Sequence, residues 1–260
     1  MQIAELFIDE RYERITLPPV DSEVLPGVPW GRHEALFTPA YWKVQTEIHK
    51  SACDTAGYRL GQTLHEETVA CVLGGHGIPA EIGLAAFERV RDAGILDTTE
   101  ATEDDYVALL QRPLVVENGR TVKYRFAKSK AAFLAAAHTA FATETPPADD
   151  IELRTWLLRI KGIGPKTASW IVRNWLSSDN VAILDIHIYR AGVFAGIFAP
   201  ADTVERDYFT MENRFLSFAR GMDVSAAALD AIMWAQMRTA NRSVKSYLTS
   251  YAMEDEPTKH

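Results

Sequence analysis

Cysteine is scarce in this chain, which has 260 residues and only two cysteines, Cys53 and Cys71. Two thiols exclude an iron–sulfur cluster or a metal site held by four cysteines, and they exclude a framework of several disulfides. No apolar run approaches the ~18 residues that a membrane-spanning helix needs. The charged opening residues, MQIAELFIDERYERITL, lack the pattern of a secretory signal. The sequence therefore predicts a cytoplasmic protein that has no membrane partner.

Basic residues are also fewer than acidic ones. The chain has 27 Lys and Arg and 35 Asp and Glu, which gives a net charge of −8. The distribution matters more than the total for nucleic-acid binding. Basic residues gather in RTVKYRFAKSK (120–130) and RSVKS (242–246), and acidic residues gather in TEDD (102–105) and EDE (254–256). A basic stripe on an acidic body is compatible with salt-dependent DNA binding. The alternative is that these basic residues form the solvated face of a hairpin and bind no DNA.

Helical patterns cover most of the chain after residue 38. They predict helices in TPAYWKVQTEIHKSA, EETVACVLGG, GIPAEIGLAAFERVRDAGIL, AKSKAAFLAAAHTAFA, PPADDIELRTWLLRI, PKTASWIVRNWL, TVERDYFTMENRFLSFARG and SAAALDAIMWAQMRTA. Asn118-Gly119, between alternating apolar positions, predicts one β-hairpin with a type I′ turn. The first 40 residues, which are rich in proline from 18 to 39, are expected to be irregular. The predicted class is all-α with one small β-hairpin.

Two predicted helices flank the turn GIG (162–164) in TWLLRIKGIGPKTASWIV (155–172). Glycines permit the backbone angles of a tight turn. The second helix starts at Pro165, and its unpaired N–H groups and positive dipole end form a phosphate site. We predict a helix-hairpin-helix that binds one DNA strand through its phosphates, although a glycine-rich turn without a ligand is the alternative. The predicted backbone contacts are Lys161, Gly162, Gly164 and Thr167.

Lys166 stands at the second position of that helix, where the dipole disfavours a cation. An amine is nucleophilic only in its neutral form, which partial burial and the dipole both favour. Asp185 follows an apolar, strand-like run and precedes a helix, so it is a predicted N-cap. One helix and one loop separate the two residues, a path that can bring them to the same cleft. A solvated lysine and a purely capping aspartate are the alternatives.

GIGPKTA (162–168) followed by ILDIHIYR (183–190) resembles the helix-hairpin-helix DNA glycosylases, in particular the 8-oxoguanine DNA glycosylase/AP lyases of the compact prokaryotic Ogg type. YRFAKSKAAFL, ETVACVLGGHGIPAEIGLAAFERV and LDAIMWAQMR are similar to other helices of the family, so the resemblance covers about residues 60–240. It implies two helical subdomains with a cleft between them. Residues 60–178 would form a helical barrel domain with the hairpin, and 1–59 plus 179–260 a second helical domain.

The resemblance implies a bifunctional enzyme that flips a modified base, first of all 8-oxoguanine or a related oxidised purine, out of double-stranded DNA. Lys166 would attack the sugar C1′, displace the base and leave a Schiff base that undergoes β-elimination. Asp185 would stabilise positive charge on the sugar or orient the amine. Two alternatives stay open. One is the same chemistry on another damaged base, or on a deliberately modified base in foreign or phage DNA. The other is a non-catalytic DNA-binding protein.

His76, in the loop GGHGIP (74–79), matches by position the family residue that fills the stack behind a flipped base. The candidates for the base pocket are Trp42, Phe126, Asp230, Trp234 and Gln236. The alternatives are that His76 is a histidine on an exposed glycine-rich turn and that the aromatic candidates belong to the hydrophobic core. No cofactor and no iron–sulfur cluster is expected, apart from a monovalent cation at the hairpin carbonyls, and the protein is expected to be a monomer.

Overall fold

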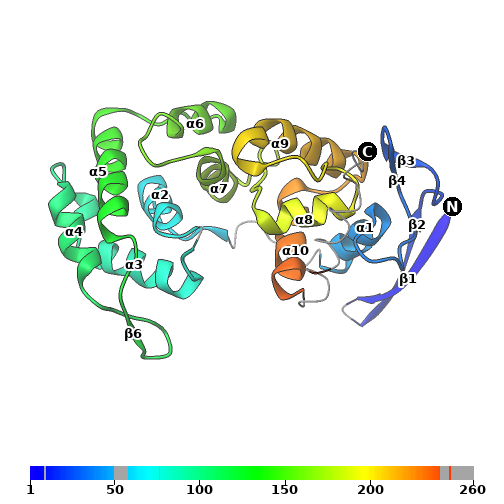
Figure 1. Cartoon of the computed structure of the whole chain (residues 1–260), viewed down its shortest axis with the longest axis horizontal. Coiled ribbons are helices and arrows are strands. Elements are labelled where there is room, and N and C mark those ends of the chain that lie inside the picture. Colours follow the sequence, from blue (N-terminus) through cyan, green and yellow to red (C-terminus); the bar gives the residue numbers. More distant parts are fainter. Residues whose placement is uncertain (9, 50–57, 76, 241–245, 247–260) are drawn as a thin grey trace, which may run out of the picture. The chain divides into compact units, whose positions relative to one another are not determined.

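The computed structural model describes residues 1–8, 10–49, 58–75, 77–240 and 246 (Figure 1). These residues form ten α-helices, a short 3-10 helix and three two-stranded antiparallel sheets. The predicted helical class is confirmed, and the predicted hairpin is present, but the described residues also contain two further two-stranded sheets that were not predicted. The chain divides into two compact units. We call residues 56–178 the hairpin unit and residues 1–55 with 179–260 the terminal unit.

The hairpin unit is built around α2 (Leu64–Leu73), which packs against α3 (Ala80–Asp92), α5 (Ala127–Thr143) and α7 (Pro165–Leu176). Its other elements are η3 (Ile95–Asp97), α4 (Glu103–Gln111), β5 (Leu114–Val115), β6 (Thr121–Val122) and α6 (Asp150–Leu157). The core residues are apolar positions at helical spacing, and they include Phe87, Leu110, Leu134, Leu157 and Ile171. Burying these stripes against α2 and against one another joins the helices into one body.

Helix α4 was not among the predicted helices, although its first residues carry a start signal. TEDD, interpreted above as an acidic cluster, is the N-cap and first turn of α4. The Thr102 hydroxyl accepts from the Asp105 N–H at 3.3 Å, and Asp105 Oδ2 accepts from the Thr102 N–H at 2.9 Å. This reciprocal pair is a capping box. The hydrogen bonds from Thr102 lower the pKa of Asp105, so the acidic cluster serves the helix end.

The hairpin of β5 and β6 forms where it was predicted, but its turn differs. A type I′ turn needs positive φ at both central residues. Gly119 has a φ of +77°, whereas Asn118 is absent from the described residues with positive φ. The Gly119 N–H donates to Val116 O at 2.7 Å, and the Asn118 side-chain oxygen accepts from the Arg120 N–H at 3.0 Å. Only the glycine therefore takes the left-handed conformation, so the type I′ prediction is wrong.

The terminal unit combines α1 (Pro39–Ile48) with α8 (Ile186–Phe194), α9 (Val204–Gly221) and α10 (Ala226–Thr239). α10 packs against α1, α8 and α9. Trp42, Phe215, Phe218, Leu229 and Met233 lie in the shared core. Segments from both ends of the chain thus build one hydrophobic core around α8, the helix that follows Asp185.

The first 17 residues form two strands, which corrects the expectation of an irregular segment. β1 (Gln2–Ile8) pairs with β2 (Arg11–Leu17) in antiparallel register, from Gln2 opposite Leu17 to Ile8 opposite Arg11. Ala4 and Leu17 are buried, whereas Phe7 and Tyr12 are exposed. Two-residue alternation between a buried and an exposed face explains the strands. β3 (Glu23–Leu25) and β4 (Val28–Pro29) form a second short pair among the prolines. None of the helices that the structure describes has the length and hydropathy required to span a bilayer.

Candidate active site

The turn between α6 and α7 is closed by its own backbone and by one buried side chain. The N–H groups of Arg159 and Ile160 donate to Trp156 O and Leu157 O at 3.1 and 3.0 Å. The Ile163 N–H donates to Ile160 O at 3.1 Å, and the Ile163 side chain is buried. The helix-hairpin-helix geometry predicted from GIG is therefore present, with the Ile163 side chain buried.

The two glycines of the turn differ in what they allow. Gly162 has a φ of +89°, and a Cβ placed on it would lie 2.1 Å from a ring carbon of Phe133 on α5. Gly164 has a φ of −91°, and a Cβ on it would meet nothing within 4 Å. Gly162 is thus required by the packing of the turn. Gly164 instead leaves open space at the start of α7.

The start of α7 has no side-chain cap, because its N-cap residue is Gly164. Side-chain oxygens cap α1, α2, α4, α6, α8 and α10. Lys166 and Thr167, the second and third residues of α7, are half-buried, and Lys161 in the turn is exposed. Lys166 is therefore not a fully solvated surface lysine. The positive end of the α7 dipole, with no capping side chain of its own, favours an anion.

Buried polar contacts anchor the other end of α7. Glu67 of α2 is buried, and its Oε1 accepts from the Asn174 amide at 2.8 Å. Glu67 Oε2 accepts from the N–H groups of Leu60 and Gly61 at 2.7 and 2.9 Å. The Arg173 guanidinium lies 4.6 Å from the centre of the Tyr58 ring. These contacts tie α7 to α2 and to the first described residues of the hairpin unit, so the position of its N-terminus is set by the core.

Asp185 is the N-cap of α8, as predicted. Its Oδ1 accepts from the N–H groups of His187 and Ile188 at 2.8 and 3.0 Å. The residue is half-buried, so part of it is accessible. The segment before it, residues 181–184, is irregular and not a strand. The capping prediction is confirmed, and the strand-like interpretation of the preceding run is wrong.

Residues 55–224 match a family model described as 8-oxoguanine DNA glycosylase. The chain belongs to this family. The matched region includes the hairpin, Lys166 and Asp185, and it leaves the N-terminal strands, α1 and all of α10 outside. The resemblance inferred from GIGPKTA and ILDIHIYR is thereby confirmed at the level of the family.

Known members of the 8-oxoguanine DNA glycosylase family agree with this assignment. An 8-oxoguanine DNA glycosylase/AP lyase of Metallosphaera sedula is 32% identical over 117 residues. That match covers 43% of this chain and 57% of the relative, so the chain spans less than two thirds of that protein.

Two solved structures share the fold of this family member. The crystal structure of the Methanocaldococcus jannaschii 8-oxoguanine DNA glycosylase has a TM-score of 0.60 at 23% identity. The match covers 81% of this chain and 99% of that one. A second structure of the M. jannaschii glycosylase/lyase, in complex with a 15mer DNA containing 8-oxoguanine, has a TM-score of 0.52 at 23% identity. It covers 77% of this chain and 90% of that chain.

The predicted base-pocket residues of this glycosylase-family chain have different surroundings. Trp42 is 0% exposed in the core of the terminal unit, so its prediction as a base contact is wrong. Asp230 is 3% exposed and its carboxylate accepts from the Ile183 N–H at 3.3 Å, which makes it a buried structural group and corrects its prediction as a base-edge contact. Gln236 accepts from the Tyr41 hydroxyl at 2.6 Å and donates to the Gln45 side chain at 2.7 Å. Internal contacts therefore occupy both ends of the Gln236 amide.

Trp234 is the base-pocket candidate with the most accessible side chain, at 39% exposure. The Arg238 guanidinium lies 4.6 Å from the centre of its ring, and the His187 ring lies 6.3 Å away in an edge-on arrangement. Phe126 belongs to the hairpin unit, is half-buried and lies beneath the Arg125 guanidinium. His76, the predicted stack-filling residue, lies outside the described residues. These roles stay predictions.

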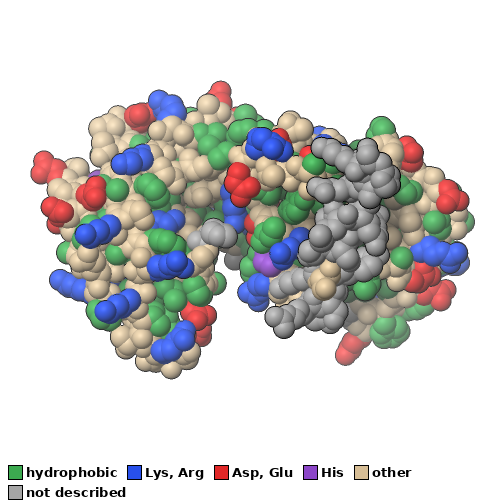
Figure 2. Space-filling view, in the orientation of Figure 1, with side chains coloured by type: hydrophobic (Ala, Val, Ile, Leu, Met, Phe, Trp, Pro, Cys, Tyr) green, Lys and Arg blue, Asp and Glu red, His purple; other side chains and the backbone are tan. Residues whose placement is uncertain are grey.

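The basic stripe predicted around residues 120–130 presents less exposed positive charge than its composition indicated. Lys130 donates to Val72 O at 2.6 Å, and burial lowers its pKa. Arg120 forms an ion pair with Glu81 at 3.1 Å. Lys123 and Lys128 are exposed. Figure 2 shows lysine and arginine side chains spread over the visible face of the hairpin unit rather than joined in one block. Arg242 and Lys245 lie outside the described residues.

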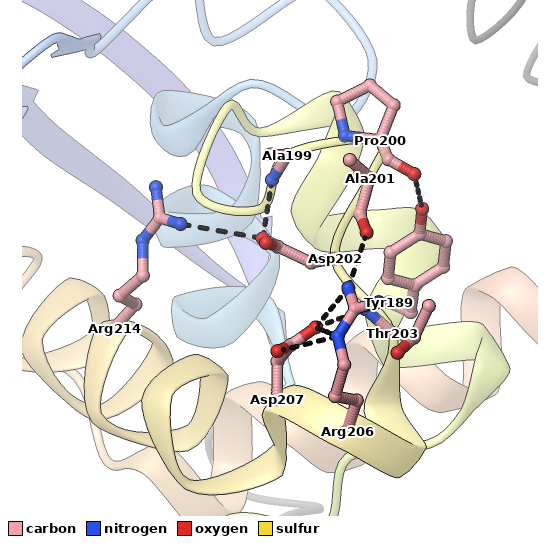
Figure 3. Close-up of polar contacts among 9 residues, drawn as sticks. All are labelled: Tyr189, Ala199, Pro200, Ala201, Asp202, Thr203, Arg206, Asp207 and Arg214. Carbon is pink, nitrogen blue, oxygen red and sulfur yellow. Dashed lines mark hydrogen bonds and ion pairs between the residues drawn. The ribbon is translucent and has the colours of Figure 1, made fainter.

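Polar contacts join α8 to the loop that leads to α9 and hold that loop together (Figure 3). The Tyr189 hydroxyl donates to Pro200 O at 2.8 Å. Asp202 accepts from the Ala199 N–H at 2.7 Å and from Arg214 at 3.4 Å. The Tyr189 bond joins the helix that Asp185 caps to this loop, and the Asp202 bonds tie the loop to α9. Within the described ranges, no three His, Cys, Asp or Glu side chains are grouped to hold a metal ion.

Proposed function

We propose that this protein is a bifunctional 8-oxoguanine DNA glycosylase/AP lyase. The proposal depends above all on one observation: a chain of this family carries a lysine at the second position of α7, the helix that follows the GIG turn and begins without a side-chain cap. The related enzyme of M. sedula is named for the same two activities. The glycosylase/lyase of M. jannaschii was solved with DNA containing 8-oxoguanine, and we assign this chain the same substrate.

In this proposal the hairpin binds a phosphate of the damaged strand. The open space at Gly164 lets a phosphate approach the first N–H groups of α7, whose dipole attracts the negative charge. The exposed Lys161 and the half-buried Thr167 add a cation and a hydroxyl. Contacts of this kind hold DNA without distinguishing its sequence. The choice of base would therefore depend on the pocket that receives the flipped nucleotide.

Lys166 acts as the nucleophile in the proposed reaction. Its neutral Nζ forms a bond to C1′ of the deoxyribose while the bond from C1′ to the base breaks, and the base leaves with the electron pair and takes up a proton. The sugar ring then opens to give a Schiff base between Nζ and C1′. Loss of a C2′ proton and cleavage of the bond from C3′ to the 3′ phosphate oxygen complete the β-elimination.

Asp185 acts on the same nucleotide in this proposal. Positive charge develops on the sugar as the base departs, and a fixed carboxylate stabilises that charge without having to reorient. The two N–H groups of α8 that donate to Asp185 hold its side chain in one orientation. Trp234, exposed and stacked with Arg238, is our choice for the flat surface that receives the flipped base.

The decisive experiment presents the purified chain with duplexes that each carry one altered base, 8-oxoguanine among them, beside an undamaged duplex. Released base and strand cleavage are measured separately. We expect release of 8-oxoguanine, cleavage of the same strand and a covalent adduct after borohydride reduction. Release from a different duplex only would assign the chemistry to another damaged or modified base. Binding to every duplex without release or adduct would overturn the enzymatic proposal in favour of a DNA-binding protein.

A further inference from the structure

The segment that precedes Asp185 has no regular hydrogen bonding of its own. Residues 181–184 belong to neither a helix nor a strand, yet Val181, Ala182 and Leu184 are fully buried. Buried backbone N–H and C=O groups need partners, because leaving one unpaired costs about as much as a lost hydrogen bond. The partners of this segment therefore decide how its backbone runs into Asp185.

Three buried side chains from α9 and α10 supply those partners. Glu212 Oε1 accepts from the Ala182 N–H at 3.0 Å, and Asp230 Oδ2 accepts from the Ile183 N–H at 3.3 Å. The Tyr208 hydroxyl donates to Ala182 O at 2.7 Å and lies 3.4 Å from the Leu184 nitrogen. Three successive residues before Asp185 are thus held through their main chain by groups 24 to 47 residues away in sequence.

Holding a loop with two buried carboxylates carries a free-energy cost. Removing a carboxylate from water is unfavourable unless hydrogen bonds compensate it. Glu212 is 1% exposed and Asp230 is 3% exposed, so neither is a surface group that happens to reach the backbone. Their position next to the residue assigned to charge stabilisation gives the arrangement a purpose, because a catalytic group displaced by about 1 Å loses much of its effect.

We infer that Tyr208, Glu212 and Asp230 are positioning residues for Asp185: they hold the peptide segment 181–184 and thereby set the place of the carboxylate at the sugar. This inference rests on the proposed function. The expected effect is on base release, because the departure of the base creates the positive charge that Asp185 stabilises. Elimination at a preformed abasic site needs Lys166 and its Schiff base, but no base departs in that reaction.

The test compares Tyr208→Phe with Tyr106→Phe. Tyr208 and Tyr106 are both buried. Tyr208→Phe loses the phenolic hydrogen bonds with Ala182 O and the Leu184 N–H, and Tyr106→Phe loses the phenolic hydrogen bond with His138 Nδ1 at 3.1 Å. Two rates are measured under single-turnover conditions: release of 8-oxoguanine, and cleavage at a preformed abasic site. For Tyr208→Phe we expect base release about 10-fold or more slower and abasic-site cleavage unchanged. Tyr106→Phe should leave both rates unchanged.

Glu212 provides a second comparison that keeps the inference testable if one variant folds poorly. Glu212→Gln retains a side-chain oxygen that can accept from the Ala182 N–H, whereas Glu212→Met retains the length but no acceptor. We expect base release to be slowed strongly only in Glu212→Met, with DNA affinity unchanged in both. The conservative variant thus rescues the positioning role.

The outcomes separate the inference from the function it rests on. If the wild-type chain releases no base from any duplex, the proposed function fails and the inference with it. If the wild type releases 8-oxoguanine but Tyr208→Phe and Glu212→Met release it equally fast, only the inference is overturned. The inference is also overturned if both variants lose base release and abasic-site cleavage in equal proportion, because general destabilisation then explains the loss.

Discussion

Two helix starts in this protein are built in opposite ways. α7 begins after Gly164, which provides no capping side chain, and carries Lys166 in its first turn. α8 begins after Asp185, whose own carboxylate accepts two of the first N–H groups. One start favours an anion from outside the chain, and the other is satisfied by an anion that belongs to it. In the proposed function, the same backbone property serves DNA binding in the hairpin unit and the orientation of a carboxylate in the terminal unit.

The difference also explains why different groups support the two starts. The turn before α7 is held by local backbone bonds and by the contact of Gly162 with Phe133. The segment before α8 has no such regular turn and depends on Tyr208, Glu212 and Asp230. A helix start that follows a short local turn needs little help from distant residues. A start that follows an irregular buried segment needs partners from other helices.

The largest expected effect comes from removing the amine at the open helix start. Lys166→Gln should abolish the borohydride-trapped adduct and strand cleavage, because no other group in the proposal forms the Schiff base. Lys161→Gln is the matched variant from the same turn. It should weaken DNA binding and reduce its salt dependence, yet still form the adduct. Trapping that survives in Lys166→Gln would assign the nucleophile to another residue.

The capped helix start is tested by Asp185→Asn. Asparagine caps helices as well as aspartate does, so we expect the free energy of unfolding to stay nearly the same. Loss of the charge should slow base release about 10²–10³-fold. Asp149→Asn is the control, since Asp149 Oδ1 caps α6 in the same way, accepting from the Ile151 and Glu152 N–H groups at 3.0 Å each. Equal rates in the two variants would leave Asp185 with a capping role alone.

The two glycines of the hairpin sharpen the comparison further. Gly162→Ala places a side chain at positive φ and against Phe133, and it should lower the free energy of unfolding by about 1–3 kcal/mol. Gly164→Ala enters open space at an ordinary φ, so the protein should lose less than about 1 kcal/mol. Its methyl group should instead weaken DNA binding. Chemical denaturation and binding titrations distinguish the two, and identical profiles would contradict these roles.

The smallest expected effect concerns the stability of the hairpin unit in acid. Burial, with a contribution from nearby His138, lowers the pKa of His65 from 6.5 to about 4. Between these values the unfolded chain binds more protons than the folded one, so stability falls as the pH drops from about 6.5 to about 4. His65→Phe retains a ring against Phe141 and should flatten this dependence. The measurement is the melting temperature of both proteins at several pH values across that range. An equal pH dependence in wild type and His65→Phe would contradict the assignment.

Much of the fold and part of the site could be predicted from short stretches of sequence. Pro165 marks the start of α7, Thr38 and Ser225 cap α1 and α10, and Asp185 caps α8. Each signal concerns bonds between residues no more than four apart, so the chain carries it locally. Local signals also exist for α4 and for the hairpin of β1 and β2, although their residues were interpreted as an acidic cluster and as an irregular segment.

The amino-acid sequence by itself determined most of the helices, the hairpin with Lys166, the capping role of Asp185 and the family. Only the tertiary structure decided which side chains stand beside them. It buried Trp42, turned Asp230 toward Ile183, which is 47 residues away, and packed Phe133 against Gly162. The physical reason is that helix ends depend on neighbours in sequence, whereas the direction a side chain faces depends on how distant helices pack.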